Sequence, residues 1–384
     1  MITELTLRNF KCFSDFRFEL SALTALTGYN SSGKSTSIQG LLLISQALRA
    51  DNDAKSLGLN GDLLRIGSFA DLLKANSSEL IEIGIATSDG DQARWTLGQS
   101  ASLDKRFVDV KGVMVCHRGG NANPERHPKV SPAAGRARQL MVEIRELIYI
   151  SAIRRIEDAA FAPPEDTKLI QGNVGTGGEY APWWLARMAD EICEPARRNP
   201  SEKGITIRSQ VTAWLDYLFP GTAVTTETLV PTSLTALSFA VGSSNVWLRP
   251  SNVGFGLSYS LPILVALLCA KPGQLIIIDS PEAHLHPRAQ SLFGKLLAHF
   301  ANAGLRIVVE THSDHVIAGM RVAVKSGKLR ATDLSVYFFG NGNSDVSSTS
   351  VSLIQIDRNG MVESWPAGFF DQSEKDLATL SGWN

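Results

Sequence analysis

The stretch Gly28-Tyr-Asn-Ser-Ser-Gly-Lys-Ser35 decides the fold of this chain of 384 residues. It matches the pattern G-x-x-x-x-G-K-S/T at every fixed position. The residues before it, 16–27, are apolar in the manner of a strand, and residues 34–50 carry apolar side chains at helical spacing. A glycine-rich loop between a strand and a helix is the context that a phosphate-binding loop requires.

This loop predicts a site for nucleotide phosphates. Glycines let successive backbone N–H groups converge on phosphate oxygens, and the following helix adds the positive end of its dipole. We expect Lys34 to reach the β- and γ-phosphates and the Ser35 hydroxyl to bind Mg²⁺. The chain is therefore predicted to bind ATP and Mg²⁺. The phosphate-binding residues expected in the loop are Gly28, Asn30, Ser31, Ser32, Gly33, Lys34, Ser35 and Thr36.

The composition is that of a folded cytoplasmic protein. Apolar residues make up 44% of the chain and charged residues 20%, which excludes a disordered polypeptide. A net charge of -1 gives no overall attraction to nucleic acid or anionic membranes. The four cysteines are scattered without a CxxC pair, as reduced thiols are. The longest apolar run, 261–270, falls short of the ~18 residues of a spanning helix, and the N-terminus lacks a signal-peptide layout.

The first part of the chain predicts an antiparallel β subdomain and a helical insertion. Short strands separated by turns run from 79 to 115, and residues 119–135, rich in Gly, Asn and Pro, should form an exposed loop. Residues 140–153 fit a strand or a helix equally well. Helical patterns follow at 180–194 and 209–219.

The last part of the chain predicts a parallel sheet. Helical and buried-strand patterns alternate there, and such alternation is typical of parallel strands joined by helices. The expected helices are 258–270, 287–302 and 315–325, and the expected strands are 274–279 and 306–310. We therefore divide this α/β chain into an N-terminal ATPase lobe, 1–153, a mainly helical insertion, 154–221, and a C-terminal ATPase lobe, 222–384.

In Leu275-Ile-Ile-Ile-Asp279, four apolar residues are followed by a carboxylate, and Glu282 lies three residues further on. An acid at the carboxyl end of a buried strand lies at the edge where open α/β sheets bind ligands, so Asp279 is expected to hold the metal with Ser35. Glu282 is a candidate general base that polarises the attacking water. It is equally well interpreted as a residue that caps or salt-bridges the next helix.

Three histidines lie near these carboxylates. His284 and His286 lack a third nearby ligand, which favours a role other than metal binding. His312 follows the next buried strand, in Glu310-Thr-His-Ser-Asp314, and is predicted to contact the γ-phosphate and report its presence.

A second anion site is predicted in Asn252-Val-Gly-Phe-Gly-Leu-Ser258. Proline is tolerated only in the first turn of a helix, so Pro262 leads us to expect that the helix begins near Ser258. Free backbone N–H groups would then lie beside the Ser258 hydroxyl. One sheet does not easily bring this helix end to its own phosphate loop, whereas a second copy turned about a two-fold axis does. This geometry predicts a homodimer with ATP between the protomers.

The segments GYNSSGKST, SNVGFGLS, LIIIDSPEAHLHP and ETHSDH, in this order, resemble the ABC-type ATPase heads of chromosome-maintenance (SMC) and recombination-repair proteins. They are more similar still to the bacterial branch related to the overcoming-lysogenization-defect ATPases. The tail Glu363-Ser-Trp-Pro-Ala-Gly-Phe-Phe-Asp371 resembles a bacterial subgroup whose C-terminal segment is a domain of unknown function. The resemblance implies a P-loop NTPase of the ABC-type head class.

The resemblance also implies residue roles. Asp279 would bridge the metal, Ser258 with Gly256 would form the signature that acts in trans, and His312 would be the switch histidine. The segment Leu7-Arg-Asn-Phe-Lys-Cys-Phe13 resembles the first strand of the family, whose basic residue, here Lys11, would approach the nucleotide. One position departs from the family, because Ser280 stands where most members carry the catalytic glutamate. Either Glu282 substitutes for that glutamate or hydrolysis is slow.

The family-typical glutamine loop is not identifiable, since Gln39 lies on the first helix. No fused nuclease domain is expected either, so a nuclease would be a separate protein.

Three functions are consistent with these patterns. The first is an ATPase that dimerises around ATP and switches a DNA or nuclease partner, in anti-phage defence or DNA maintenance. The second is a non-hydrolysing ATP-dependent scaffold, which Ser280 keeps open. A transporter subunit is disfavoured by the inserted strands and the tail. Basic clusters that would line a DNA groove or lie on solvated surface are Lys105-Arg106, Arg136-Ala-Arg138, Arg154-Arg155 and Arg197-Arg198.

Overall fold

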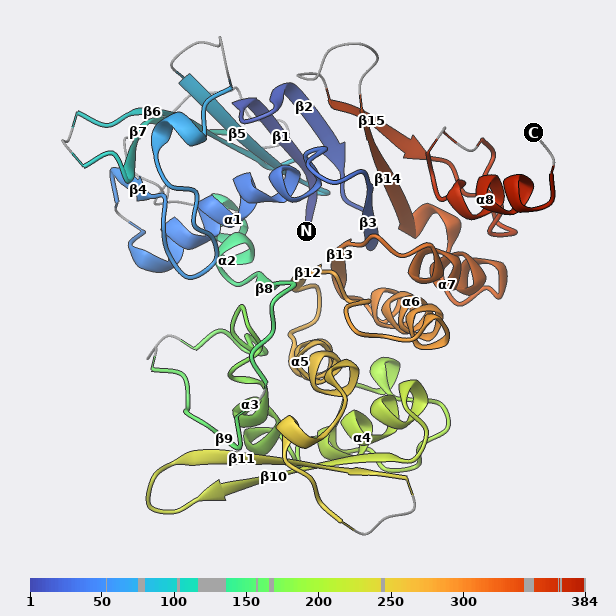
Figure 1. The fold of residues 1–384 in the computed structure, drawn as a ribbon. Helices are drawn as coiled ribbons and strands as arrows, with labels where there is room; N and C mark the ends of the chain where they lie inside the picture. Colours follow the sequence, from blue (N-terminus) through green and yellow to red (C-terminus); the bar gives the residue numbers. More distant parts are fainter. Residues whose placement is uncertain are drawn as a thin grey trace.

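A six-stranded sheet carries the glycine-rich loop in the computed structural model (Figure 1). The strand order is β15-β14-β3-β13-β12-β8, and all neighbours are parallel except β15, which runs antiparallel to β14. These strands are β3 (Leu23–Gly28), β8 (Ile148–Ile150), β12 (Leu275–Asp279), β13 (Arg306–Glu310), β14 (Leu334–Asn341) and β15 (Thr349–Ile354). The mixed, mainly parallel sheet predicted from the sequence is confirmed.

The residues that the structure describes are 1–52, 54–74, 80–101, 104–116, 136–156, 158–165, 169–242, 246–341, 349–364, 366 and 368–382. The loop predicted at 119–135 lies outside them, as do Trp365 and Ala367 of the tail segment.

Both faces of the central sheet are buried. Successive residues of a strand point to opposite faces, so alternate residues of one strand belong to different cores. Ile276 and Ile278 belong to one hydrophobic core, whereas Leu275 and Ile277 belong to the other. The first core contains residues of α4 (Ile207–Leu218), α5 (Phe255–Cys269), α6 (Pro287–Asn302) and α7 (Asp314–Lys325). The second contains residues of α1 (Lys34–Ala50) and α2 (Arg136–Arg145).

An antiparallel sheet covers the far side of α1, at the upper left of Figure 1. Its order is β2-β1-β5-β6-β7-β4. The strands are β1 (Ile2–Phe10), β2 (Phe13–Glu19), β4 (Ser56–Gly58), β5 (Leu80–Thr87), β6 (Gln92–Gln99) and β7 (Phe107–Cys116). This is the predicted antiparallel subdomain. The apolar run 16–27 is therefore two strands, β2 and β3, which belong to different sheets.

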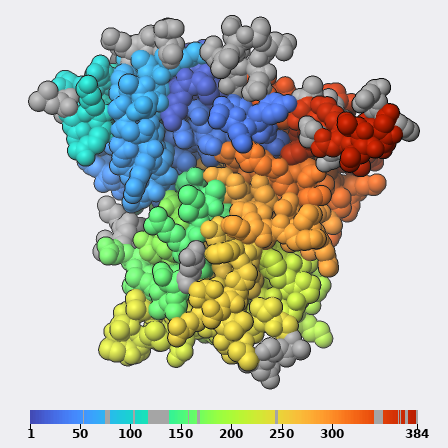
Figure 2. Space-filling view, in the orientation of Figure 1, coloured from blue at the N-terminus to red at the C-terminus, as the bar shows by residue number. Residues whose placement is uncertain are grey.

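A third layer, which we call the lower layer, lies below the central sheet in Figure 1 and forms the lower, green to yellow part of Figure 2. It holds α3 (Ala181–Arg187), α4 and a sheet of order β10-β11-β9. Its strands are β9 (Ala160–Phe161), β10 (Thr222–Leu229) and β11 (Leu234–Val241). The remaining helix is α8 (Gln372–Leu380), and the short 3-10 helices are η1 (Phe69–Asp71), η2 (Pro195–Arg197), η3 (Pro250–Asn252) and η4 (Ala331–Asp333).

Several predicted elements have the bounds that the structure shows. The helices at 34–50 and 287–302 and the strand at 306–310 are α1, α6 and β13. The ambiguous segment 140–153 contains both the end of α2 and the strand β8. None of the helices in the described ranges is long and apolar enough to cross a membrane.

The predicted start of α5 near Ser258 is wrong, because α5 begins at Phe255 and Pro262 lies in its interior. A proline inside a helix costs about 3 kcal/mol, since it removes one hydrogen bond and crowds the carbonyl four residues back. In α5 that cost is offset by burial of Leu261, Leu264 and their neighbours, each worth about 1.5–3 kcal/mol. The proline ring also has a close partner: a Cβ on Gly178 would lie 2.5 Å from its Cγ.

Candidate nucleotide-binding site

The glycine-rich loop turns sharply between β3 and α1. Gly28, Ser31 and Gly33 have positive φ angles of 132°, 59° and 98°. A Cβ at Gly28 would lie 2.1 Å from the carbonyl oxygen of Phe339, so the neighbouring strand leaves room for glycine alone. Gly33 caps α1 without a side chain, which leaves the first-turn N–H groups to a ligand.

Lys34 lies across this loop and is 3% exposed. Its Nζ donates to the carbonyl oxygens of Gly28, at 3.1 Å, and Tyr29. Burial lowers the pKa of Lys34, and the nearby carboxylates of Glu310 and Asp279 oppose that shift. The ammonium group is therefore held against the loop, in the lining of the pocket beside it.

A pocket of about 310 Å³ opens beside the loop. It is lined by Lys11, Cys12, Asn30, Ser31, Gly33, Lys34, Ser35, Thr36, Glu310 and His312. Most of the predicted phosphate-binding residues thus surround one cavity with two lysines. Ser32 and Gly28 support the loop instead, since the Ser32 hydroxyl donates to the Tyr29 carbonyl at 2.7 Å and the Gly28 carbonyl accepts from Lys34.

Two carboxylates lie side by side at the carboxyl ends of β12 and β13, where Asp279 is paired in register with Glu310. The Ser35 hydroxyl donates to Glu310 Oε1 at 2.9 Å, and the Ser280 hydroxyl donates to Asp279 Oδ1 at 2.8 Å. Burial and the neighbouring Asp279 raise the pKa of Glu310 to about 7. Sequence reasoning gave Glu310 no role, although a charged residue that ends a buried strand beside Asp279 was a usable signal.

Oxygen ligands of this kind suit Mg²⁺. Ser35, Asp279 and Glu310 supply one hydroxyl and two carboxylates, and Glu310 Oε2 is buried without a hydrogen-bond partner among the described residues. The residues present therefore fit a hard cation. No larger group of His, Cys, Asp and Glu side chains in the described ranges is arranged to hold a metal ion.

Glu282 connects the loop after β12 to the tip of β13. Its Oε2 accepts from the Thr311 hydroxyl at 2.8 Å, and its Oε1 accepts from the His312 backbone N–H at 2.7 Å. The interpretation of Glu282 as a cap of the next helix is wrong, because His286 fills that position by accepting from the Arg288 N–H. Its role as a general base stays a prediction.

His284 and His312 lie in different environments. His284 packs against the rings of Phe255 and Tyr259, with ring centroids 5.3 and 4.9 Å away. The lining of the phosphate pocket includes His312, as predicted, and burial together with the charge of Lys34 lowers the pKa of this imidazole.

Arg154 is a buried cation that sequence reasoning assigned to the surface. It is 1% exposed, and its Nη2 donates to the carbonyl oxygens of Asp279, at 2.5 Å, and Ser280, at 3.1 Å. Its guanidinium carbon lies 5.6 Å from the ring centroid of Tyr259 in α5. Burial lowers its pKa to about 10. Arg154 thus joins the loop after β8 to the Asp279 loop and to α5.

The predicted basic clusters do not form one surface. Arg197 is 2% exposed and donates to carbonyl oxygens at the end of α5, so it is buried like Arg154. Arg106 is paired with Asp104 at 2.8 Å. The side chain of Arg136 lies outside the described residues. The prediction that Arg154 and Arg197 line a DNA groove is therefore wrong.

Ser258 and Gly256 do not line the phosphate pocket of their own chain. Ser258 is 2% exposed, its N–H is bonded within the helix to the Gly254 carbonyl, and its hydroxyl lies 3.5 Å from the Pro250 carbonyl. The predicted free N–H groups at Ser258 are wrong because the helix begins three residues earlier. Phe255, the first residue of α5, is 53% exposed.

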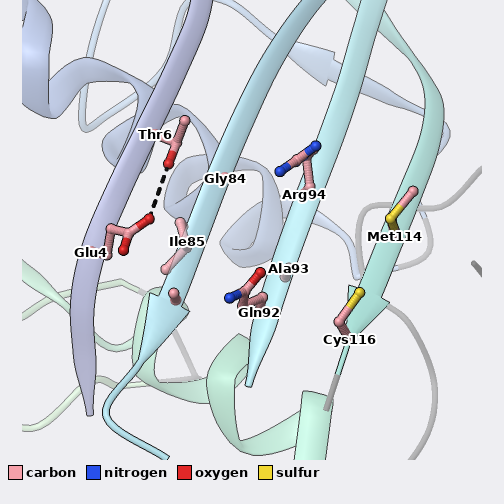
Figure 3. A pocket seen from close by; sticks show the side chains of 10 residues that line it. Glu4, Thr6, Gly84, Ile85, Gln92, Ala93, Arg94, Met114 and Cys116 are labelled. Carbon is pink, nitrogen blue, oxygen red and sulfur yellow. Dashed lines mark hydrogen bonds between the residues drawn. The ribbon is translucent and has the colours of Figure 1, made fainter. Parts of the chain in front are cut away.

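A smaller pocket of about 90 Å³ lies on the antiparallel sheet (Figure 3). Side chains of β1, β5, β6 and β7 line it, among them Glu4, Thr6, Arg94 and Cys116. None of the predicted site residues belongs to its lining.

Fold and site define a P-loop ATPase, and comparisons with known families agree. Residues 127–318, half of the chain, match the family described as "AAA domain, putative AbiEii toxin, Type IV TA system". The chain therefore belongs to this family of AAA-type ATPase domains, which supports ATP binding and ATPase activity. Residues 1–90 match the "AAA ATPase domain" family, and residues 329–380 match "Protein of unknown function (DUF3696)". No curated protein matches the chain.

Solved structures of SMC heads share the fold. An SMC head bound to the C-winged helix domain of ScpA has 16% identity and a TM-score of 0.60, over 93% of this chain and 98% of that chain. An SMC head with an extended coiled coil, bound to the C-terminal domain of ScpA from Pyrococcus furiosus, has 14% identity and a TM-score of 0.52, over 99% of both chains. The predicted ABC-type head fold is confirmed.

Proposed function

We propose that the chain is a slow, Mg²⁺-dependent ATPase that dimerises around ATP and acts as a switch for a separate partner. The observation that carries this proposal is the 310 Å³ pocket, in which Lys34, Ser35 and His312 meet over the carboxyl ends of the central strands. Ligands of open α/β sheets bind at that edge.

Different residues of the pocket are assigned to charge neutralisation, metal binding and γ-phosphate sensing. Lys34 and Lys11 neutralise negative charge, and the first-turn N–H groups of α1 bind phosphate oxygens. Ser35 and Asp279 would hold Mg²⁺, which supplies charge stabilisation for phosphoryl transfer. His312 is the proposed sensor of the γ-phosphate, since it lines the same pocket opposite the loop.

Slow hydrolysis is supported by the loop after β12. Ser280 adopts a positive φ of 48° and donates its hydroxyl proton to Asp279, so no carboxylate stands at this position. Glu282 already accepts two hydrogen bonds from the β13 tip. We therefore propose Glu282 as a positioning residue for His312, and the non-hydrolysing scaffold remains the alternative function.

The homodimer is supported by the signature segment. Gly256 and Ser258 are absent from the pocket lining of their own chain, while Phe255 leaves an apolar ring exposed at the start of α5. A second protomer would place this helix end against the bound ATP. Because Ser258 is buried, the backbone around Gly254 is the better phosphate contact, with Ser258 supporting it from behind.

The partner class rests on the relatives and on the sequence motifs. The matched family carries a toxin description, and the similar SMC head is bound to a winged-helix domain. The ScpA domain bound to that SMC head supports a separate protein partner, whereas a DNA or effector-nuclease partner and a role in anti-phage defence or DNA maintenance rest on the resemblance of the sequence motifs. The cytoplasmic location and the three-part division of the chain stay predictions.

Two measurements on the full chain test the proposal. Phosphate release with Mg·ATP should be slow in the wild type and absent in Lys34→Ala. Light scattering should give a dimer mass with Mg·ATP and a monomer mass with ADP. An ATP-dependent dimer without phosphate release would favour the scaffold, and a chain that does not bind ATP would refute both functions.

A further inference from the structure

The acid that contacts the phosphate loop is Glu310. The Ser35 hydroxyl donates to Glu310 Oε1 at 2.9 Å, whereas Oδ1 of Asp279 accepts from Ser280 at 2.8 Å. The strand order explains the difference, because β13 lies between β3 and β12. Glu310 therefore stands between the loop that follows β3 and the carboxylate at the end of β12.

Glu310 is buried, but one of its two carboxylate oxygens has no hydrogen-bond partner among the described residues. The residue is 5% exposed, and its Oε2 has no hydrogen-bond partner within the described part of the chain. Buried carboxylate oxygens are normally satisfied, so an orphaned one calls for a missing donor or cation. Because Glu310 lines the phosphate pocket, a group bound in that pocket is the nearest candidate for the missing donor or cation.

Glu310 Oε1 accepts the proton of the Ser35 hydroxyl, and the chemistry of that hydroxyl explains why an acceptor is needed. A hydroxyl has one proton to donate and two lone pairs to offer. When the oxygen of Ser35 uses a lone pair for Mg²⁺, its proton still needs an acceptor. Glu310 Oε1 is that acceptor, and the bond it makes fixes the rotation of the hydroxyl.

We propose that Glu310 is the positioning residue of the Mg²⁺ site: Oε1 orients the Ser35 hydroxyl for the metal, and Oε2 accepts from water that the metal retains. Mg²⁺ in nucleotide sites usually keeps several waters, which are donors of the required kind. Outer groups that orient a metal ligand typically change metal affinity by 10–100-fold when they are removed. This inference rests on the proposed ATP site and assigns a role to a residue that the sequence did not single out.

The experiment measures how strongly Mg²⁺ promotes nucleotide binding, without any turnover. A fluorescent derivative of the non-hydrolysable analogue AMP-PNP is titrated into the full chain, once in excess Mg²⁺ and once in EDTA. The ratio of the two Kd values reports the coupling between metal and nucleotide. We expect Glu310→Ala to lower this ratio by about 10–100-fold and to leave the Kd in EDTA within about threefold of the wild type.

Two further variants separate positioning from simple structural support. Glu310→Gln should recover part of the ratio, because its amide oxygen still accepts the Ser35 proton. The loss caused by Glu310→Ala should be smaller in the Ser35→Ala background than in the wild type, because Oε1 acts through the Ser35 hydroxyl. Glu227→Ala, at an exposed position of β10, is the control and should match the wild type.

Three results would overturn the inference. They are a wild-type ratio near one, an unchanged ratio in Glu310→Ala, and additive losses from Ser35→Ala and Glu310→Ala. If Glu310→Ala does not fold, an unchanged ratio in both Glu310→Gln and Ser35→Ala overturns it. A wild type that fails to bind AMP-PNP in either condition refutes the proposed ATP site itself, which distinguishes the two failures.

Discussion

Replacing Glu282 by Gln tests whether this carboxylate positions the β13 tip or activates water. Its two oxygens accept from the His312 N–H at 2.7 Å and from the Thr311 hydroxyl at 2.8 Å. In Glu282→Gln, the amide oxygen still accepts from His312, and the amide NH₂ can donate to the Thr311 oxygen, which also accepts hydrogen bonds. The geometry survives and the negative charge is removed.

The expected magnitudes differ widely between the two roles. Exchanging two charge-assisted bonds for neutral ones should lower the free energy of unfolding by about 1–2 kcal/mol. As a positioning residue, Glu282→Gln should lower kcat by less than about tenfold, whereas loss of a general base costs about 10²–10⁴-fold. Glu282→Ala removes both acceptors and should cost roughly 2–4 kcal/mol, because Thr311 is fully buried.

The assay combines phosphate release at saturating Mg·ATP with urea unfolding of the same samples. Thr311→Val is the control that keeps the carboxylate; it removes one of the two bonds to Glu282 and also the acceptor of the Ser313 N–H, so it should lower stability as well. A fall in kcat beyond about 100-fold in Glu282→Gln, with unfolding unchanged, would identify Glu282 as the base and refute our reasoning.

Four other changes test the site and its surroundings. Lys34→Ala should weaken ATP binding by about 3–6 kcal/mol, the value of two charge-assisted bonds, in a fluorescence titration; a loss below tenfold would contradict the loop assignment. Ser280→Glu should raise kcat in phosphate release if the missing carboxylate limits hydrolysis, and the positive φ should add little cost, because Ser280 already has a Cβ there. Phe255→Glu should abolish the ATP-dependent dimer in light scattering, with the exposed Ile192→Glu as control; a persistent dimer would exclude this helix end. Burial lowers the pKa of His299, so its contribution to stability should be complete above about pH 6.5 and lost as pH falls toward the folded pKa; this slope should vanish in His299→Gln urea melts.

Regular periodicity made much of the fold predictable. The helices 34–50 and 287–302 and the strand 306–310 are long or strongly apolar segments with clear ends, and their bounds agree with the structure. The start of α5 was misplaced because the rule against interior proline is local, while the packing that overrides it is tertiary. Residues 140–153 were ambiguous for a physical reason: they contain the end of one helix and one strand.

The candidate site was predictable only where its chemistry is local in sequence. The loop, Asp279 and His312 were found because each belongs to a short motif at the end of a strand. Glu310 and Arg154 were missed because their roles come from partners far away in the chain. Ser35 and Glu310 are 275 positions apart, and Arg154 and Asp279 are 125 apart. The position of Glu310 at the end of a buried strand was a local signal, but no local pattern marks its partner, and a charged residue in a sequence is usually expected on the surface.

The buried guanidinium of Arg154 has a mechanical consequence. It bonds the backbone that carries Asp279 and lies against Tyr259 of α5, and α5 in turn packs on α3 and α4 of the lower layer. A displacement of the lower layer would therefore reach the Asp279 loop through Arg154 as well as through the direct packing of α5 on β12. If a partner protein grips that layer differently in the two nucleotide states, ATP must change the partner's affinity by the same factor by which the partner changes that of ATP. Arg154 would then couple the two sites, and its removal should weaken the effect of each ligand on the other.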